Sequence, residues 1–261
     1  PEVRLMAQGA GLEIATVPVE PEAFQASLAK IGPGELLYLI PSFHNPTGRT
    51  LSPEQRKNVL EAASRIGFWV IEDDAYGELR FGESSVPALK SIDQESRVLY
   101  LGSFSQLLFP GMRIGYVLMP EETRKEFLSV LERTSGSTSS LVQHLVNAFI
   151  EDRSLEVSLD LARNSMASRM RTLCNCLGAS LPGLPFETPQ GGIYLWLRTP
   201  GRSGTLVAGT AKKAGVGIVP GRLFSYAGED IEAVRLSVSR LSTVMIQEAV
   251  ERFASAWEKR S

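Results

Sequence analysis

The sequence predicts an α/β protein in which a mostly parallel sheet, with helices on both faces, is followed by a smaller α+β lobe. In the first half, short apolar runs typical of buried strands alternate with amphipathic helical patterns, as in chains that build parallel sheets. The second half is mostly helical, with a few short strand patterns. We expect a large domain over residues 1–165 and a small domain over 166–261, with the boundary near Ser165 in a long helix.

The chain begins with an alternating segment over 11–20, which predicts a strand, and Pro18 places it at an edge or a strand end. A short helix is expected over 21–30. The continuous apolar run at 36–40 then predicts a buried strand, which leads into a turn rich in Pro, Asn and Gly over 41–48.

The clearest helix start in the sequence is at Ser52. Ser52 is suited to the N-cap, Pro53 to the first helical position, and Gln55 to the return contact of a capping box. Gly67 ends the pattern. The expected apolar stripe of this helix is Val59, Ala62, Ala63 and Ile66.

The remaining elements follow from the same periodicities. Strands are expected over 68–71, 97–101, 114–119, 192–197, 216–219 and 233–238. Helices are expected over 121–133, 139–150, 155–177, 204–214 and 244–257. The helix over 155–177 is long enough to bridge the two lobes.

The composition is that of an ordinary globular protein, with 261 residues of which 43% are hydrophobic and 21% charged. A formal charge of −2 gives no indication of a nucleic-acid or membrane surface as the main partner. The basic cluster of Arg163, Arg169 and Arg171 lies in a helical pattern and is interpreted as a solvated helix face. No apolar run approaches the roughly 18 residues of a membrane span.

The cysteines and histidines give no metal or disulfide pattern. Cys174 and Cys176 are too few for a disulfide framework or a zinc site, and His44 and His144 do not complete one. We interpret His44, which lies beside a turn, as structural. A reducing cytoplasm fits this cysteine content.

Polar side chains follow three of the predicted strands: Asn45, the group over 73–76, and the pair Ser103 and Ser105. Ligands of parallel sheets bind beyond the carboxyl ends of the strands, so the three groups predict one shared site. Ser103, Ser105 and Arg113 suit a phosphate dianion, because hydroxyls donate hydrogen bonds and a guanidinium adds a charged fork. The alternative is an ordinary turn with a surface ion pair.

These segments, HNPTG at 44–48, DDAY at 73–76, SFSQ at 103–106 with PGMRIGY at 110–116, and VRLS at 234–237, resemble a known family in that order. The sequence is similar to the fold-type I class I/II aminotransferases, which use pyridoxal phosphate (PLP), and to the aminotransferase-like domain of MocR-type (GntR) regulators. The resemblance implies an aspartate-aminotransferase-like three-layer sandwich. It also implies an upstream cofactor-binding segment, which would lie before Pro1.

The resemblance assigns cofactor roles to the polar strand ends. It implies that Asp73 pairs with the pyridine nitrogen of PLP, because a buried anion raises the pKa of that nitrogen and makes the ring an electron sink. It implies that Tyr76 and Asn45 contact the ring phenolate oxygen. Without the resemblance, Asp73 would cap a turn or helix and Tyr76 would fill the core. Asp74 is interpreted as a turn or cap residue.

The resemblance also implies a phosphate site and a substrate site. Ser103, Ser105 and Arg113 would hold the cofactor phosphate. Arg235 matches the arginine that grips the substrate α-carboxylate, and Asn45 is assigned to the substrate site as well. An Arg inside an apolar strand is unusual unless it is paired. The double glycine at 191–192 is interpreted as serving backbone geometry.

One catalytic position departs from the family pattern, since the sequence has Gln106 where the family has lysine. That lysine forms a Schiff base with PLP and moves a proton, and both tasks need a basic amine. A carboxamide can do neither, so covalent attachment should fail and transamination should be crippled. An inactivated variant, a natural non-catalytic member and an enzyme with noncovalent cofactor all fit this residue. Noncovalent binding of PLP is expected to persist.

The leading hypothesis is therefore a PLP-dependent aminotransferase-type protein acting on α-amino acids and 2-oxo acids. A second hypothesis is the effector-binding domain of a MocR-type regulator, in which turnover is unnecessary. A third is a degenerate domain retained for dimer contacts. The family resemblance implies a cytoplasmic homodimer, and we expect this segment to contact neither nucleic acid nor membrane.

Overall fold

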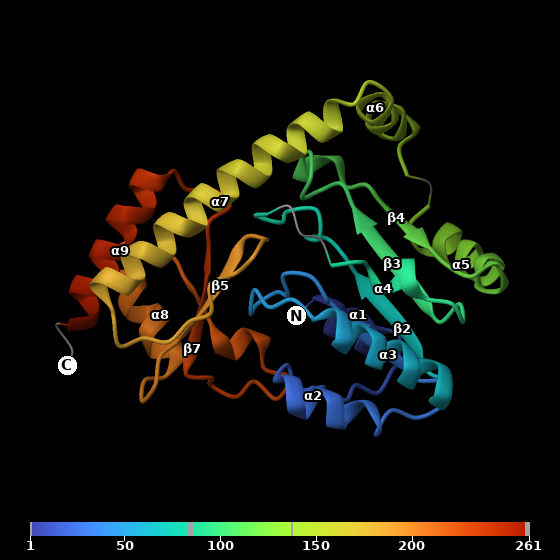
Figure 1. The fold of residues 1–261 in the computed structure, drawn as a ribbon, viewed down its shortest axis with the longest axis horizontal. Coiled ribbons are helices and arrows are strands. Elements are labelled where there is room, and N and C mark those ends of the chain that lie inside the picture. Colours follow the sequence, from blue (N-terminus) through green and yellow to red (C-terminus); the bar gives the residue numbers. More distant parts are fainter. Residues whose placement is uncertain (1, 83–85, 137, 259–261) are drawn as a thin grey trace.

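The computed structural model describes residues 2–82, 86–136 and 138–258. Its elements form two groups, each built around one sheet, and the long helix α7 (Ser154–Ser180) runs from one group to the other (Figure 1). The sequence predicted this bridging helix over 155–177. The chain is therefore a two-lobed α/β molecule, as expected.

The larger sheet has the order β1-β2-β3-β4. Its strands are β1 (Leu36–Leu39), β2 (Trp69–Asp73), β3 (Val98–Ser103) and β4 (Gly115–Leu118). The first three are parallel and β4 runs antiparallel to β3. Because β1 to β3 run in one direction, their carboxyl ends lie at the same edge of the sheet.

Helix α3 (Pro53–Ile66) forms as the sequence predicted. The Ser52 hydroxyl accepts a 3.1 Å hydrogen bond from the Gln55 amide, and the Gln55 side chain accepts one of 2.9 Å from the Ser52 amide. Gly67 closes the helix in the left-handed conformation, with φ of 93°. Val59, Ala62 and Ala63 of the expected stripe are buried against the sheet, and Ile66 packs there half-buried.

The core of the large lobe lies on one face of the sheet. Leu37, Val70 and Val98 point from neighbouring strands into this core. They meet helices α2 (Pro21–Leu28), α3 and α4 (Leu89–Ile92). Because side chains alternate along a strand, Asp73 lies on the face opposite to Val70 and Glu72. This alternation directs Asp73 away from the helical layer.

Two segments differ from the sequence prediction. Residues 11–20 form no strand, because they pair with neither edge of the sheet, and Val17 instead packs against the core beside α2. Helix α1 (Glu2–Gly9), which was not predicted, precedes this segment, and Arg4 donates to the Tyr226 carbonyl at 3.1 Å.

The small lobe has a three-stranded antiparallel sheet of order β5-β7-β6. Its strands are β5 (Tyr194–Arg198), β6 (Val219–Pro220) and β7 (Ala233–Ser237). Helices α7, α8 (Gly204–Lys213) and α9 (Thr243–Glu258) pack with this sheet around a second core. The strand predicted over 216–219 is shorter, because Val216 bonds to the last turn of α8, where its amide meets the Ala211 carbonyl at 2.9 Å.

The connecting helices match their predicted ranges closely. They are α5 (Glu121–Thr134) and α6 (Ser140–Glu151), and the short 3-10 turns are η1 (Pro110–Met112) and η2 (Gly221–Phe224). The basic cluster on α7 is not simply solvated as expected. Arg163 donates to the Glu78 carbonyl at 2.7 Å, and Arg169 donates to the Ser239 carbonyl at 3.0 Å.

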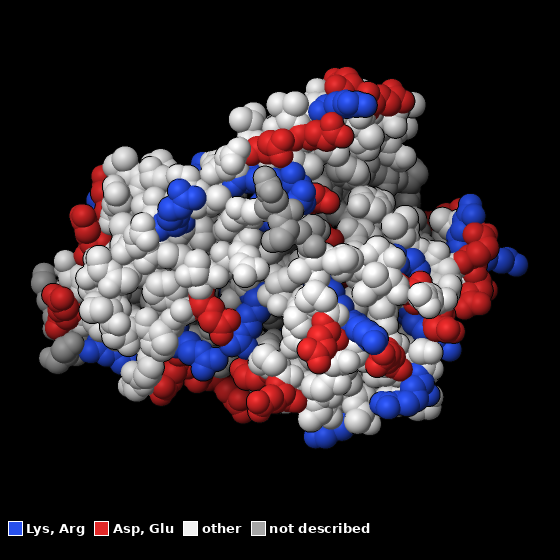
Figure 2. Space-filling view, viewed as in Figure 1, with Lys and Arg blue, Asp and Glu red and all other residues white. Residues whose placement is uncertain are grey.

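Charges of both signs are intermixed over the face shown in Figure 2, with no extended field of one sign. Within the described ranges, none of the helices is both long and apolar enough to cross a membrane.

Candidate functional site

The structure brings one polar strand end of the large lobe, Asn45, against the small sheet. Asn45 follows β1, Asp73 ends β2, and Ser103 ends β3. In the small sheet, β7 carries Arg235. The Nη1 of Arg235 donates a 2.7 Å hydrogen bond to Oδ1 of Asn45, across 190 positions of sequence. This bond joins the two lobes at the predicted site.

The Arg235 guanidinium lies close to two aromatic rings. Its central carbon lies 4.1 Å from the centre of the Tyr194 ring and 4.9 Å from that of Phe224. Both contacts are cation–π interactions, which favour Arg over Lys. The buried Nε atom has no hydrogen-bond partner within the described chain. The guanidinium therefore retains a donor for an acidic ligand group.

The Asp73 carboxylate is tied down from two sides. Its Oδ2 accepts a hydrogen bond from the Tyr38 hydroxyl, and its Oδ1 accepts one of 3.3 Å from the Ala75 amide. Tyr38 comes from the neighbouring strand β1 and lies on the same face of the sheet as Asp73. Burial raises the pKa of Tyr38, and the Asp73 charge raises it further, so the phenol stays a donor to this carboxylate.

Asp74 points to the other face of the sheet and does not share the site with Asp73. Its Oδ2 accepts a 2.9 Å hydrogen bond from the Tyr100 hydroxyl of β3, whereas the sequence suggested a turn or cap residue. Burial is the largest cause that raises the pKa of Asp74. The alternation of the strand thus separates the two adjacent carboxylates.

Tyr76 lies between Asp73 and the small lobe. It is 8% exposed, and its ring meets that of Tyr194 edge to face at a centroid distance of 5.7 Å. Burial is the main cause that raises the pKa of Tyr76, followed by the neighbouring Tyr194 hydroxyl. The phenol therefore stays protonated at neutral pH and can donate a hydrogen bond.

The residues predicted to bind a phosphate lie in and beside a turn after β3. The Ser105 amide donates a 3.2 Å hydrogen bond to the Ser103 hydroxyl, and Ser105 is buried. The Phe104 amide donates to the Ile114 carbonyl at 3.1 Å, which brings Arg113 alongside this turn. Arg113 is exposed and adopts the left-handed conformation, with φ of 49°. Gln106 follows Ser105 in the same turn and is exposed.

His44 is structural, as the sequence suggested. Its Nδ1 lies 2.9 Å from the Thr47 hydroxyl, and its amide donates to the Arg49 carbonyl at 2.8 Å. Burial, with a smaller effect of the Arg49 charge, lowers the pKa of His44 to about 4. The ring is therefore neutral at physiological pH and holds the loop that carries Asn45.

The double glycine seats this loop against the small lobe. A Cβ at Gly191 would lie 2.3 Å from the Phe43 ring, and one at Gly192 would lie 2.7 Å from the Phe43 Cβ. Gly192 also needs the left-handed region, with φ of 72°. Both glycines thus serve backbone geometry, as predicted, because Phe43 packs onto the chain where a side chain would stand.

Tyr38, Tyr194 and Phe224 were missed by the sequence analysis. Tyr38 interrupts an apolar strand two positions before its end, which is a weak signal. Tyr194 and Phe224 have no local signal, because they contact the site only after the small sheet folds. No metal-binding group of His, Cys, Asp or Glu is found among the residues that the structure describes.

A parallel sheet joined by a long helix to a smaller lobe is the fold of the aspartate-aminotransferase-like PLP transferases. The chain belongs to the aminotransferase class I and II family, whose model matches residues 1–253. Solved structures agree with this fold. The α-aminoadipate aminotransferase LysN of Thermus thermophilus has a TM-score of 0.89 at 30% identity, covering 95% of this chain and 66% of LysN.

Curated relatives include both enzymes and regulators. The 2-aminoadipate transaminase of Thermus thermophilus is 33% identical over 225 residues, covering 84% of this chain and 56% of the transaminase. The uncharacterized HTH-type transcriptional regulator YisV of Bacillus subtilis is 32% identical over 243 residues, covering 90% of this chain and 49% of YisV. The chain spans about half the length of the curated relatives it matches.

The cofactor expected from the sequence is confirmed at the level of the family. The LysN structure holds N-(5'-phosphopyridoxyl)-L-leucine, a derivative of PLP joined to an amino acid. A kynurenine aminotransferase of Pyrococcus horikoshii, with a TM-score of 0.83 at 27% identity, was solved with pyridoxamine phosphate (PMP). That structure covers 99% of this chain, which spans 60% of the enzyme.

Proposed function

We propose that this chain binds PLP or PMP between its two lobes, together with an α-amino acid or a 2-oxo acid. The proposal rests on one observation above all, the hydrogen bond between Asn45 and Arg235. It joins the residue proposed to contact the ring phenolate oxygen to the residue proposed to bind the substrate carboxylate. A single ligand that carries both groups would contact both side chains.

The donor and acceptor set fits a phosphorylated pyridine. When bound, PLP supplies an electron-withdrawing ring, and the Asp73 carboxylate offers an anion for its nitrogen. The protonated phenol of Tyr76 and the Asn45 amide offer donors for the phenolate oxygen. The Ser103 and Ser105 hydroxyls with the Arg113 guanidinium offer a phosphate site.

We propose that Arg235 binds the carboxylate of the amino acid or 2-oxo acid. The Nε atom, which has no partner among the described residues, and the two neighbouring aromatic rings support this role. Among the side chains, a guanidinium best matches a carboxylate, because it can donate two parallel hydrogen bonds.

Gln106 is proposed to occupy the position of the family's lysine. It directly follows Ser105 in the turn, and a carboxamide is neither basic nor nucleophilic at neutral pH. The chain with Gln106 is therefore proposed to bind the cofactor noncovalently, without turnover.

A second candidate function is the effector-binding domain of a MocR-type regulator. Two observations favour it: the match to the regulator YisV over 90% of this chain, and the carboxamide at position 106. A sensor needs binding but no turnover, so Gln106 is compatible with this function. An N-terminal winged-helix domain in the full-length protein would favour the regulator over the enzyme.

The decisive experiment tests for a covalent link. We expect the wild-type protein to bind PMP, but to show only trace labelling of exposed lysines such as Lys57 when it is mixed with one equivalent of PLP and reduced with borohydride. The Q106K variant should gain one phosphopyridoxyl group, located at position 106 by peptide mass spectrometry. Q143K, which alters an exposed residue of α6, is the control and should gain no group at position 143. An unlabelled but folded Q106K protein would contradict the proposed lysine position.

The proposed assembly is a cytoplasmic homodimer. The family resemblance supports the dimer, and the two free cysteines, Cys174 and Cys176, are compatible with a reducing compartment. Light scattering coupled to gel filtration measures the oligomeric state directly.

A further inference from the structure

A charged residue outside the proposed binding groups is completely buried beneath the loop that carries Asn45. The Arg56 side chain lies on the apolar stripe of α3 and is 0% exposed. Burying a guanidinium costs free energy unless its donors have hydrogen-bond acceptors, so the contacts of Arg56 indicate its structural role.

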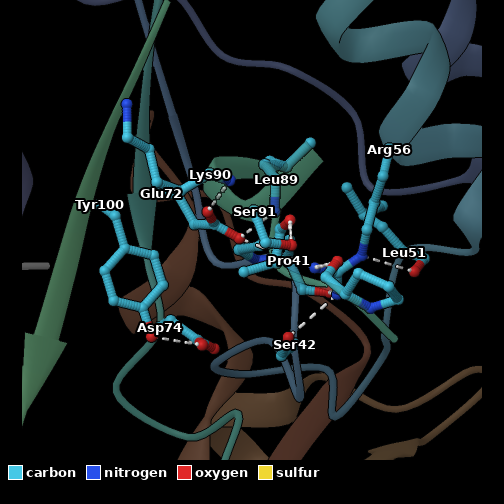
Figure 3. Close-up of polar contacts among 12 residues, drawn as sticks. Pro41, Ser42, Leu51, Arg56, Glu72, Asp74, Leu89, Lys90, Ser91 and Tyr100 are labelled. Carbon is cyan, nitrogen blue, oxygen red and sulfur yellow. Dashed lines mark hydrogen bonds and ion pairs between the residues drawn. The ribbon is translucent and has the colours of Figure 1, made fainter. Parts of the chain in front are cut away.

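Those contacts are mostly with backbone carbonyls, as Figure 3 shows. The Nε atom donates to the Leu51 carbonyl at 3.2 Å, and Nη2 donates to the Pro41 carbonyl at 3.0 Å. Nη2 also donates to the Ser42 hydroxyl at 2.9 Å, and Nη1 donates to the Pro87 carbonyl at 3.1 Å. Three of these acceptors lie in one loop, at its two ends.

Pro41 and Leu51 form the neck of the loop that carries Asn45. The Leu51 amide donates a 2.8 Å hydrogen bond to the Pro41 carbonyl and closes the loop. Arg56 bonds to the carbonyls on both sides of this neck, so its planar fork fixes the spacing of the loop ends. An apolar side chain could fill the same volume, but it would make none of these directional contacts.

Glu72 connects Arg56 to the strand that carries Asp73. Its carboxylate is fully buried, and its Oε1 lies 3.7 Å from Nη1 of Arg56. It also accepts 2.8 Å hydrogen bonds from the Leu89 and Lys90 amides. Since Glu72 directly precedes Asp73 in β2, the buried ion pair links the neck of the loop to the end of this strand.

We propose that Arg56 is a positioning residue, which fixes the Asn45 loop relative to Asp73 so that both side chains face the same ring. The inference rests on the proposed function, because it assumes that Asn45 and Asp73 bind one cofactor. The proposal predicts that Arg56 affects contacts with the cofactor ring. The proposed phosphate-binding residues Ser103, Ser105 and Arg113 lie on another loop, so phosphate binding should not depend on Arg56.

The test compares a ligand with a ring to one without. In the full-length protein, R56M should weaken the binding of PMP by about tenfold, the scale of one lost hydrogen bond to a charged or polar partner. The affinity for inorganic phosphate should change by less than about twofold. R65M alters an exposed arginine of the same helix and should leave both affinities unchanged. R56K keeps the positive charge but lacks the planar guanidinium, so it should lose part of the PMP affinity. It serves as the test variant if R56M does not fold.

A double-mutant cycle shows whether Arg56 acts through Asn45. In the N45A background, R56M should cost little additional PMP affinity. Additive losses, equal losses for PMP and phosphate, or unchanged PMP binding in folded R56M and R56K would each overturn the positioning role. If the wild-type protein binds no PMP, the proposed function itself fails. If N45A weakens PMP binding and R56M does not, only the positioning inference fails.

Discussion

At the scale of single residues, Arg235 is the proposed ligand-binding side chain whose surroundings restrict it most. The guanidinium contacts the rings of Tyr194 and Phe224 and is hydrogen-bonded to Asn45, so its position is restricted before a ligand arrives. Preorganisation of this kind lowers the entropic cost of binding. Lysine, a point charge on a flexible stem, reproduces neither the stack nor the fork.

We therefore expect R235K to discriminate between two ligands. The affinity for N-(5'-phosphopyridoxyl)-L-leucine, which has an α-carboxylate, should fall roughly tenfold to a hundredfold, because a charge-assisted hydrogen-bond pair is lost. The affinity for PMP, which lacks that carboxylate, should fall much less. Calorimetric titration of both ligands measures the difference, with R222K, at an exposed position of η2, as the control. Equal losses for the two ligands would argue against a carboxylate-binding role.

His44 links the site to pH through stability rather than through chemistry. Its pKa in the folded protein, about 4, lies below the ordinary value of 6.5, so the unfolded chain binds the extra proton more readily. The stability that neutral His44 contributes is complete above pH 6.5 and is lost progressively as the pH falls from 6.5 towards 4. The full loss is on the order of 3 kcal/mol.

Urea denaturation between pH 7 and pH 4 tests this dependence. We expect H44Q to be less stable than the wild type at pH 7, but with a flatter loss of stability on acidification, because no proton binds at position 44. H144Q alters an exposed residue of α6 and should follow the wild-type curve. A parallel decline of the H44Q and wild-type curves would show that His44 does not cause the acid sensitivity.

At the scale of elements, the sequence predicted those helices and strands that are determined by interactions between residues close in the chain. The helix after Ser52 was predictable because its cap, its first-turn proline and its terminal glycine act within a few residues. The strand expected over 11–20 failed for the opposite reason, because alternation alone cannot supply a partner strand. The burial of the arginine on α3 has a sequence signal, because Arg56, Val59 and Ala63 share one helix face.

The proposed site was predictable only in part. The strand ends Asn45, Asp73 and Ser103 could be proposed from the sequence because the carboxyl ends of parallel strands lie at one edge of a sheet. The contacts that orient them, from Tyr38, Tyr194 and Phe224, depend on pairings between distant segments, which no local pattern encodes. The separation of Asp73 from Asp74 follows from strand alternation, once the bounds of β2 are known.

At the scale of the whole molecule, the proposed site depends on contacts between the two lobes. The backbone joins them where the Gly192 amide donates to the Leu79 carbonyl and the Phe81 amide donates to the Gln190 carbonyl, both at 2.8 Å. Arg49 and Glu187 add a bidentate ion pair across the same junction. The domain boundary near Ser165 stays a prediction, since Met166 of α7 packs against the core of the small lobe and also against the cluster around Phe43.

Gly191 allows the Phe43 ring of the large lobe to pack against the backbone of the small lobe. A substitution at Gly191 therefore tests whether the proposed site depends on contacts between the lobes. In G191A the new methyl carbon would lie 2.3 Å from the buried Phe43 ring, so the ring and the Asn45 loop must move away from the small sheet. Overpacking of this kind costs about 1–3 kcal/mol. We expect a lower midpoint of urea unfolding, together with weaker binding of N-(5'-phosphopyridoxyl)-L-leucine, because Asn45 and Arg235 separate. G183A adds the same methyl group where no atom lies within 4 Å, and it should match the wild type in both measurements. A destabilised G191A with unchanged ligand affinity would show that the lobes can separate at Phe43 without disturbing the site.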